Sequence, residues 1–122
     1  MKELLLVGFG GFIGSIARFL VSKLNVSWQV LAIPMGTLTV NVLGSLLIGI
    51  IVGLSAKSNL ISNELRLLLI VGFCGGFTTF SSFSNENLLL MQNGQFFTVI
   101  LYTILSITLG FLAVYLGYIL GS

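Results

Sequence analysis

The chain has 122 residues, of which 57% are hydrophobic and 7% are charged, and its formal net charge is +2. This composition is typical of integral membrane proteins, because a soluble domain needs far more surface charge to stay dispersed. The sequence has no histidine, no aspartate and a single cysteine, Cys74. These counts exclude an internal disulfide, a Cys/His zinc site and a Ser-His-Asp triad, and we expect no enzyme activity.

Apolar segments long enough to cross a membrane fill most of the chain. They predict an all-α membrane protein with a single domain, residues 1–122, and four spanning helices at roughly 4–22, 36–56, 65–91 and 96–120. Trp28, in the first connection, is interpreted as an anchor at the membrane interface. The Asn93-Gly94 pair is a tight-turn signal, so the last two helices are predicted to be adjacent and antiparallel.

Small and polar residues recur at i, i+4 spacing along these segments. The stripes are Gly10, Gly14 and Arg18 in the first segment, Thr37, Asn41, Ser45, Gly49 and Gly53 in the second, and Tyr102, Ser106 and Gly110 in the fourth, where Ala113, Gly117 and Gly121 form a neighbouring stripe. Small residues at this spacing let membrane helices approach closely, so most of these glycines are interpreted as packing positions. The amide of Asn41 needs a partner in the membrane. It is either a clasp between helices or a donor that lines a pore, and the residues alone leave both open.

The third segment contains the most unusual stretch, GFCGGFTTFSSFS at residues 72–84. Glycine lowers helix propensity, and Ser and Thr compete for backbone hydrogen bonds. Non-helical backbone at membrane depth is tolerated only inside protein or beside a wet cavity. The stretch therefore predicts a third helix broken near its middle, and such breaks commonly hold ions.

Helical spacing sorts the residues after the break onto three faces. Thr79, Ser82 and Glu86 share one face, Phe80 and Phe83 share the next, and Ser81 and Ser84 share the third. Hydroxyl groups donate hydrogen bonds without a trapping charge, and a phenyl ring is electropositive at its edge. This combination predicts a path for an anion, although paired phenylalanines are also common in helix cores.

The basic residues show almost no bias between the two membrane sides. In a four-span topology Lys2, Lys57 and Arg66 lie on one side, and Lys23 lies on the other with Arg18 near it. An excess of Lys and Arg on one side of the membrane sets the orientation of a membrane protein. Its near absence predicts insertion in both orientations and an antiparallel dimer with a twofold axis in the membrane plane.

Three blocks resemble the signature blocks of the Fluc/CrcB family of fluoride channels. They are GGFIGSIARF (10–19), GTLTVNVLGSLLIG (36–49) and GFCGGFTTFSSFSNE (72–86), and the resemblance covers essentially the whole chain. It implies a dual-topology antiparallel dimer in a bacterial or archaeal cell membrane. The implied function is passive, fluoride-selective export that lowers fluoride toxicity. The implied partners are fluoride, the lipid bilayer and a second copy of the chain or a paralogous subunit, with no nucleic acid.

The resemblance also implies roles for individual residues. A structural sodium ion that is not transported is expected on the backbone carbonyls of Gly75 and Thr78. The implied pore residues are Thr37, Asn41, Phe80, Ser81, Ser82, Phe83, Ser84, Tyr102 and Ser106, with Arg18 and Glu86 at the vestibule. The chain departs from the family pattern at Ser82, where threonine is usual, and at Leu109-Gly110, where Gly-Ser is common.

Two other readings account for parts of the sequence. A small proton-coupled multidrug exporter has a similar length, but it needs a membrane-embedded carboxylate. The first segment has no acidic residue after Glu3, and Glu86 is the best candidate elsewhere. A structural membrane assembly protein would explain the packing stripes and leave the Gly-Gly-Phe-Thr-Thr-Phe stretch unexplained.

Overall fold

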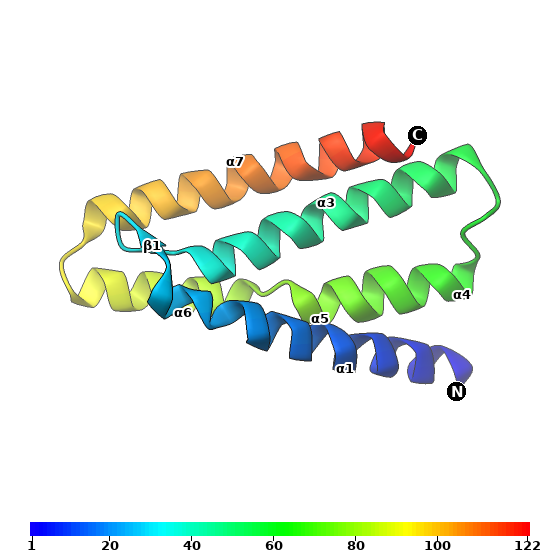
Figure 1. Ribbon diagram of the computed structural model, residues 1–122, viewed down its shortest axis with the longest axis horizontal. Coiled ribbons are helices and arrows are strands. Elements are labelled where there is room, and N and C mark those ends of the chain that lie inside the picture. The colour runs from blue at the N-terminus through cyan, green and yellow to red at the C-terminus, as the bar shows by residue number, and fades with distance from the viewer.

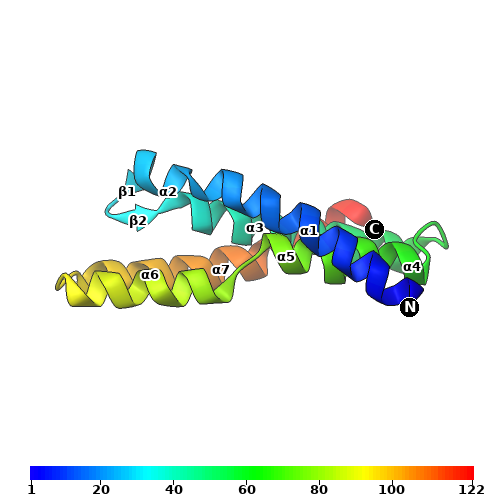
Figure 2. The same ribbon diagram turned by 90° about the horizontal axis from the view of Figure 1, so that it is seen from below.

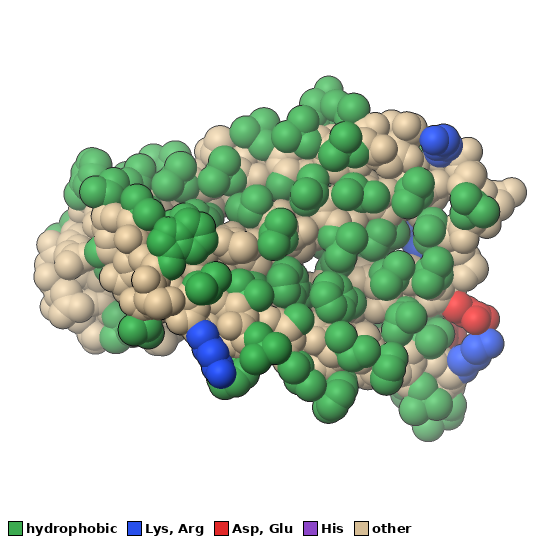
Figure 3. All heavy atoms as spheres, in the orientation of Figure 1, with side chains coloured by type: hydrophobic (Ala, Val, Ile, Leu, Met, Phe, Trp, Pro, Cys, Tyr) green, Lys and Arg blue, Asp and Glu red, His purple; other side chains and the backbone are tan.

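The computed structural model describes all 122 residues, Met1–Ser122. It is mostly helical, and four of its helices are long and apolar enough to cross a membrane, which confirms that prediction. The long helices are α1 (Lys2–Ser22), α3 (Met35–Lys57) and α7 (Phe96–Gly121), and the third span covers Asn63–Gln92. Hydrophobic side chains cover most of the face in Figure 3, and its acidic side chains gather at one end.

The third span is assembled from several helical pieces. They are α4 (Asn63–Arg66), the π-helix η1 (Leu67–Cys74), α5 (Gly75–Phe77) and α6 (Phe80–Gln92). Between α1 and α3 lie the short helix α2 (Leu24–Ser27) and the strands β1 (Gln29–Val30) and β2 (Ile33–Pro34). The strands pair antiparallel, with Gln29 opposite Pro34 and Val30 opposite Ile33.

The spans alternate in direction along the chain. Helices α3 and α7 lie side by side and run the same way, while α1 and the third span run the opposite way (Figure 1). Both termini and the connection from α3 to α4 lie at one end of the molecule, and the β hairpin and the turn from α6 to α7 lie at the other. Helices α6 and α7 are antiparallel neighbours, as Figure 2 also shows, and the Phe83 and Tyr102 rings touch between them.

Glycines bring paired helices into backbone contact. A Cβ atom at Gly14 of α1 would overlap the Phe73 carbonyl oxygen and lie 3.0 Å from the Phe77 nitrogen. A Cβ atom at Gly117 of α7 would overlap the Leu46 carbonyl oxygen of α3 in the same way. The interpretation of these glycines as packing positions is therefore confirmed, and two helix pairs, α1 with η1–α5 and α3 with α7, form the frame of the site.

Candidate functional site

Two residues of extended backbone separate α5 from α6 inside the third span. Thr78 has φ −82° and ψ 156°, and Thr79 has φ −152° and ψ 118°. Figure 2 shows this uncoiled connection between the labels α5 and α6. Thr79 then caps α6, because its Oγ1 accepts a hydrogen bond from the Ser82 N–H at 3.2 Å.

The side chain of Asn41, on α3, binds the backbone of this connection. Its Oδ1 accepts from the Thr79 N–H at 2.8 Å, and its Nδ2 donates to the Thr79 carbonyl at 3.1 Å. Both main-chain groups of Thr79 are thereby satisfied without water. The structure thus shows Asn41 as a clasp between helices, and its role in a pore stays a prediction.

Because the Thr79 and Ser82 N–H groups bind side chains, two carbonyl groups lack the N–H donors that they would have in a continuous helix. In a continuous α-helix the Thr79 N–H would bind the Gly75 carbonyl, and the Ser82 N–H would bind the Thr78 carbonyl. Here those two N–H groups are directed to the side chains of Asn41 and Thr79. Gly75 is also exposed on the surface of the chain. Main-chain oxygens without their helical donors are a suitable donor set for a hard cation.

A third carbonyl at the end of α5 receives a charged donor. The Nε of Arg18, on α1, donates to the Gly76 carbonyl oxygen at 2.9 Å. A cation is favourable at the C-terminal end of a helix, where carbonyl groups lack partners. Arg18 therefore ties α1 to the end of α5 and does not simply extend to the membrane surface.

A polar cavity of about 220 Å³ lies beside this connection. A single hydrophobic residue is among its lining residues, which are Arg18, Ser22, Asn25, Thr37, Val40, Thr79, Ser82, Asn85 and Glu86. They come from α1, α2, α3 and α6 and from the connection before α6. The cavity brings together four residues that the sequence indicated for the ion path or its vestibule: Arg18, Thr37, Ser82 and Glu86.

Glu86 is the centre of a hydrogen-bond cluster at the cavity wall. Its Oε1 accepts from the Tyr102 hydroxyl at 2.7 Å, and its Oε2 accepts from the Thr37 Oγ1 at 2.5 Å and from the Asn25 Nδ2 at 3.1 Å. Thr37 and Tyr102 are buried, with 2% and 0% exposure. Sequence reasoning missed Asn25, whose only signal was a polar side chain in a connection.

The remaining predicted pore residues are not among those that line the cavity. The Phe83 ring contacts Tyr102 edge-on at a centroid distance of 4.9 Å and Phe80 at 5.8 Å. Phe80 is 78% exposed, and Ser81 and Ser84 are also exposed. A single chain therefore leaves much of the predicted aromatic and hydroxyl track on its outer surface.

A further hollow adjoins this track at Phe80, and two polar atoms are buried in α6 and α7. The hollow, shallow and of about 250 Å³, is lined by Asn41, Ser45, Ile48, Thr78, Thr79 and Phe80. The Oγ of Ser106, in α7, and the Oδ1 of Asn87, in α6, are buried without a hydrogen-bond partner. A polar atom that is buried without a partner is costly.

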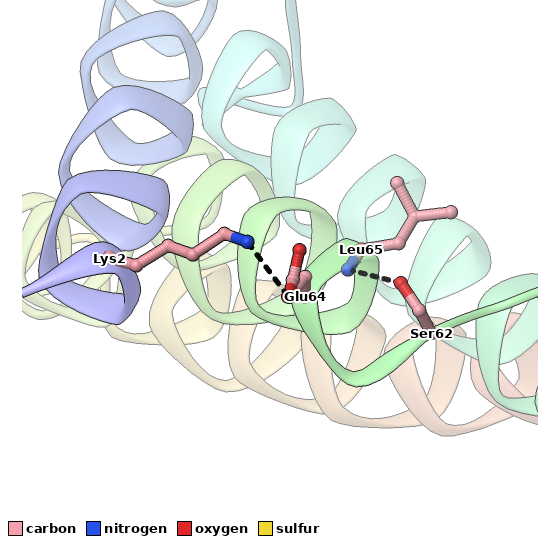
Figure 4. A network of polar contacts seen from close by, with 4 residues as sticks. All are labelled: Lys2, Ser62, Glu64 and Leu65. Carbon is pink, nitrogen blue, oxygen red and sulfur yellow. Dashed lines mark hydrogen bonds and ion pairs between the residues drawn. The ribbon is translucent and has the colours of Figure 1, made fainter.

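The other end of the molecule has a separate polar contact. The Lys2 Nζ lies 3.1 Å from the Glu64 Oε1, and the Ser62 Oγ accepts from the Leu65 N–H at 3.1 Å to cap α4 (Figure 4). The side chains of the ion pair are 71% and 58% exposed, so the pair contributes little to stability. It joins the start of α1 to the third span and takes no part in the cavity.

Comparison with known proteins places the sequence in a family. The profile described as "CrcB-like protein, Camphor Resistance (CrcB)" matches residues 5–118. The chain belongs to the CrcB family. Together with its four apolar spans, this makes it a multi-pass membrane protein.

Curated relatives of this CrcB chain carry one functional name. A protein of Azobacteroides pseudotrichonymphae is 50% identical over 98% of this chain and 96% of its own length, and it is named "Fluoride-specific ion channel FluC". Proteins of Chlorobium phaeobacteroides (53% identical over 93% of this chain and 88% of its own length) and Bacteroides fragilis (45% over 100% and 98%) bear the same name. These relatives are named as ion channels, and none of the three is named as an exporter or an enzyme.

Proposed function

We propose that this CrcB chain forms a fluoride-selective passive ion channel that exports fluoride and lowers its toxicity in the cell. The observation that carries the proposal is the near full-length similarity to proteins named as fluoride-specific channels, at 50% identity over 98% of the chain for one of them. The polar cavity beside the interrupted third span supports it from the structure.

The chemistry of the cavity suits a small anion. Fluoride holds its water tightly, so its dehydration needs several donors at the same time. The cavity offers the Arg18 guanidinium, the Ser22 and Ser82 hydroxyls and the Asn85 amide. It contains no lysine, and an ion must be bound weakly enough to leave.

The proposed path continues along α6 from this cavity. Its residues are Thr37, Asn41, Phe80, Ser81, Ser82, Phe83, Ser84, Tyr102 and Ser106, with Arg18 and Glu86 at the vestibule. The electropositive edges of Phe80 and Phe83 provide contacts for an anion that has lost water. Ser106 supplies a hydroxyl in α7, where Leu109-Gly110 lacks one.

The proposed channel consists of two copies of the chain in antiparallel orientation. Its third helix is broken at Thr78 and Thr79, and Phe80, Ser81 and Ser84 are exposed beside the break. A second copy would cover these side chains and complete the path. The nearly equal numbers of basic residues at the two ends are consistent with insertion both ways.

A structural sodium ion is proposed between the two breaks. The residues fit this ion, because the Gly75 and Thr78 carbonyls lack their helical donors and sodium prefers oxygen ligands. When bound, the ion would supply a positive charge that favours a nearby anion.

Reconstitution in liposomes tests the function. Liposomes loaded with potassium fluoride should release fluoride when valinomycin carries the potassium, as recorded by a fluoride electrode, and liposomes loaded with potassium chloride should release no more chloride than protein-free vesicles. The fluoride release should need no proton gradient. Equal release of the two anions, or fluoride release only with a proton gradient, would contradict the proposal.

A structure determined in lipid nanodiscs tests the assembly and the ion together. We expect two oppositely oriented copies, with one cation density between the Gly75 and Thr78 carbonyls in sodium buffer and none when N-methylglucamine replaces sodium throughout preparation. Parallel copies would refute the assembly. The same density in both preparations would refute the sodium assignment.

A further inference from the structure

We propose that Asn25 is a positioning residue that fixes the Glu86 carboxylate and the Thr37 hydroxyl at the wall of the polar cavity. This inference rests on the proposed function, since it concerns the same ion path. Asn25 lies on the short helix α2, outside the long helices, and it is half-buried. Its contact with Glu86 joins residues 61 positions apart in the sequence.

The backbone of α3 determines how the Asn25 amide is oriented. Asn25 faces the N–H of Thr37, in the first turn of α3, at 2.8 Å. A backbone N–H can only donate, so the atom that faces it must be the amide oxygen, Oδ1. The amide nitrogen, Nδ2, is then turned toward Glu86 without any choice between the two flipped orientations.

This orientation also directs the Thr37 hydroxyl proton. The Asn25 Nδ2 donates to the Thr37 Oγ1 at 2.9 Å and to the Glu86 Oε2 at 3.1 Å. Because the Thr37 oxygen accepts from the amide, its own proton is free to point at the Glu86 Oε2, 2.5 Å away. The amide and the hydroxyl thus hold one carboxylate oxygen, and the Tyr102 hydroxyl holds the other at 2.7 Å.

The arrangement explains how a carboxylate is tolerated beside an anion path. With its oxygens committed to three donors, the Glu86 carboxylate is kept against the wall and its negative charge is stabilised by hydrogen bonds. Without Asn25 one donor is lost, the Thr37 proton is no longer directed, and the carboxylate gains freedom to turn into the cavity. A negative charge in the cavity would oppose the entry of fluoride.

The test exchanges the polar groups of the pair. Asn25→Asp keeps an oxygen for the Thr37 N–H, and so keeps the cap on α3, but it sets a carboxylate against Glu86. We expect fluoride release to fall about tenfold, which equals about 1.4 kcal/mol on the barrier. In the double variant Asn25→Asp/Glu86→Gln, the new amide can donate to the new carboxylate, and release should return to within about twofold of Glu86→Gln alone.

Controls separate this coupling from general damage. Asn93→Asp makes the same charge change in the exposed turn before α7, and it should release fluoride as the unmodified protein does. Asn25→Ser removes the amide donor without adding charge and should also lower release. Elution volume and melting temperature, measured for every variant, identify any that does not fold. Fluoride release is then compared among the variants that fold.

The outcomes distinguish a failure of the positioning role from a failure of the proposed function. If the unmodified chain releases no fluoride, the proposed function fails. If the chain releases fluoride and Asn25→Asp lowers release by the same factor with and without the Glu86→Gln substitution, the two residues are not coupled and the positioning role is refuted. Normal release by both Asn25→Asp and Asn25→Ser would refute it as well.

Discussion

Replacing Gly117 with alanine is expected to force α3 and α7 apart and to lower the free energy of unfolding by about 3 kcal/mol, the upper end for overpacked sites. The new Cβ would overlap the Leu46 carbonyl oxygen and lie 2.9 Å from the Ile50 nitrogen. Both obstacles are backbone atoms, so no side-chain rotation can relieve the contact. The measurement is reversible unfolding in mixed micelles, followed by circular dichroism.

The matched control for this variant is Gly110→Ala in the same helix. A Cβ atom there would lie 3.8 Å from the Ser45 Oγ, which is an ordinary contact. Both substitutions gain about 1 kcal/mol of helix propensity, so the difference between them reports the helix contact alone. Equal stabilities of the two variants would show that α3 and α7 are not held at backbone distance by Gly117.

Replacing Asn41 with leucine is expected to destabilise the interrupted third span. The side chain keeps a similar size but leaves the Thr79 N–H and carbonyl without the partners they have at 2.8 and 3.1 Å. Each unpaired main-chain group costs about 1–3 kcal/mol, so for the two groups we expect a loss of about 2–6 kcal/mol in the same unfolding measurement. Fluoride release should fall by at least about tenfold, because the proposed path runs beside this connection.

Ser45→Ala is the stability control for the Asn41→Leu variant. It removes a polar atom from the next turn of α3, beside the same hollow, without touching Thr79. A loss of stability no larger for Asn41→Leu than for Ser45→Ala would show that the clasp does not support the extended backbone. Normal fluoride release by a folded Asn41→Leu protein would place the path elsewhere.

The amino-acid sequence by itself determined the number of spans and their approximate positions. About 20 consecutive apolar residues are enough to span a membrane, and a helix satisfies its own backbone hydrogen bonds. A membrane helix is therefore specified locally and needs no tertiary partner. The structure has its four long apolar helices close to the expected limits. The glycine stripes were also visible, because helical spacing alone places such residues on one face.

The β hairpin between α2 and α3 was not predicted, for a local reason. Its turn uses Leu31 and Ala32 with φ of 54° and 68°, where glycine or asparagine would be usual. Without those residue types the turn leaves no signal in the sequence. The hairpin is nevertheless consequential, since it connects the helix that carries Asn25 to the start of α3.

Only the tertiary structure decided which polar groups meet. The bonds from Arg18 to Gly76, from Asn41 to Thr79 and from Asn25 to Glu86 join residues 58, 38 and 61 positions apart. Periodicity places a residue on a face of its own helix but does not say which helix that face meets, because docking depends on the glycine contacts between helices. The sequence could therefore name polar residues for an ion path, while the folded chain assigned Asn41 to the backbone of the third span and Asn25 to the carboxylate of Glu86.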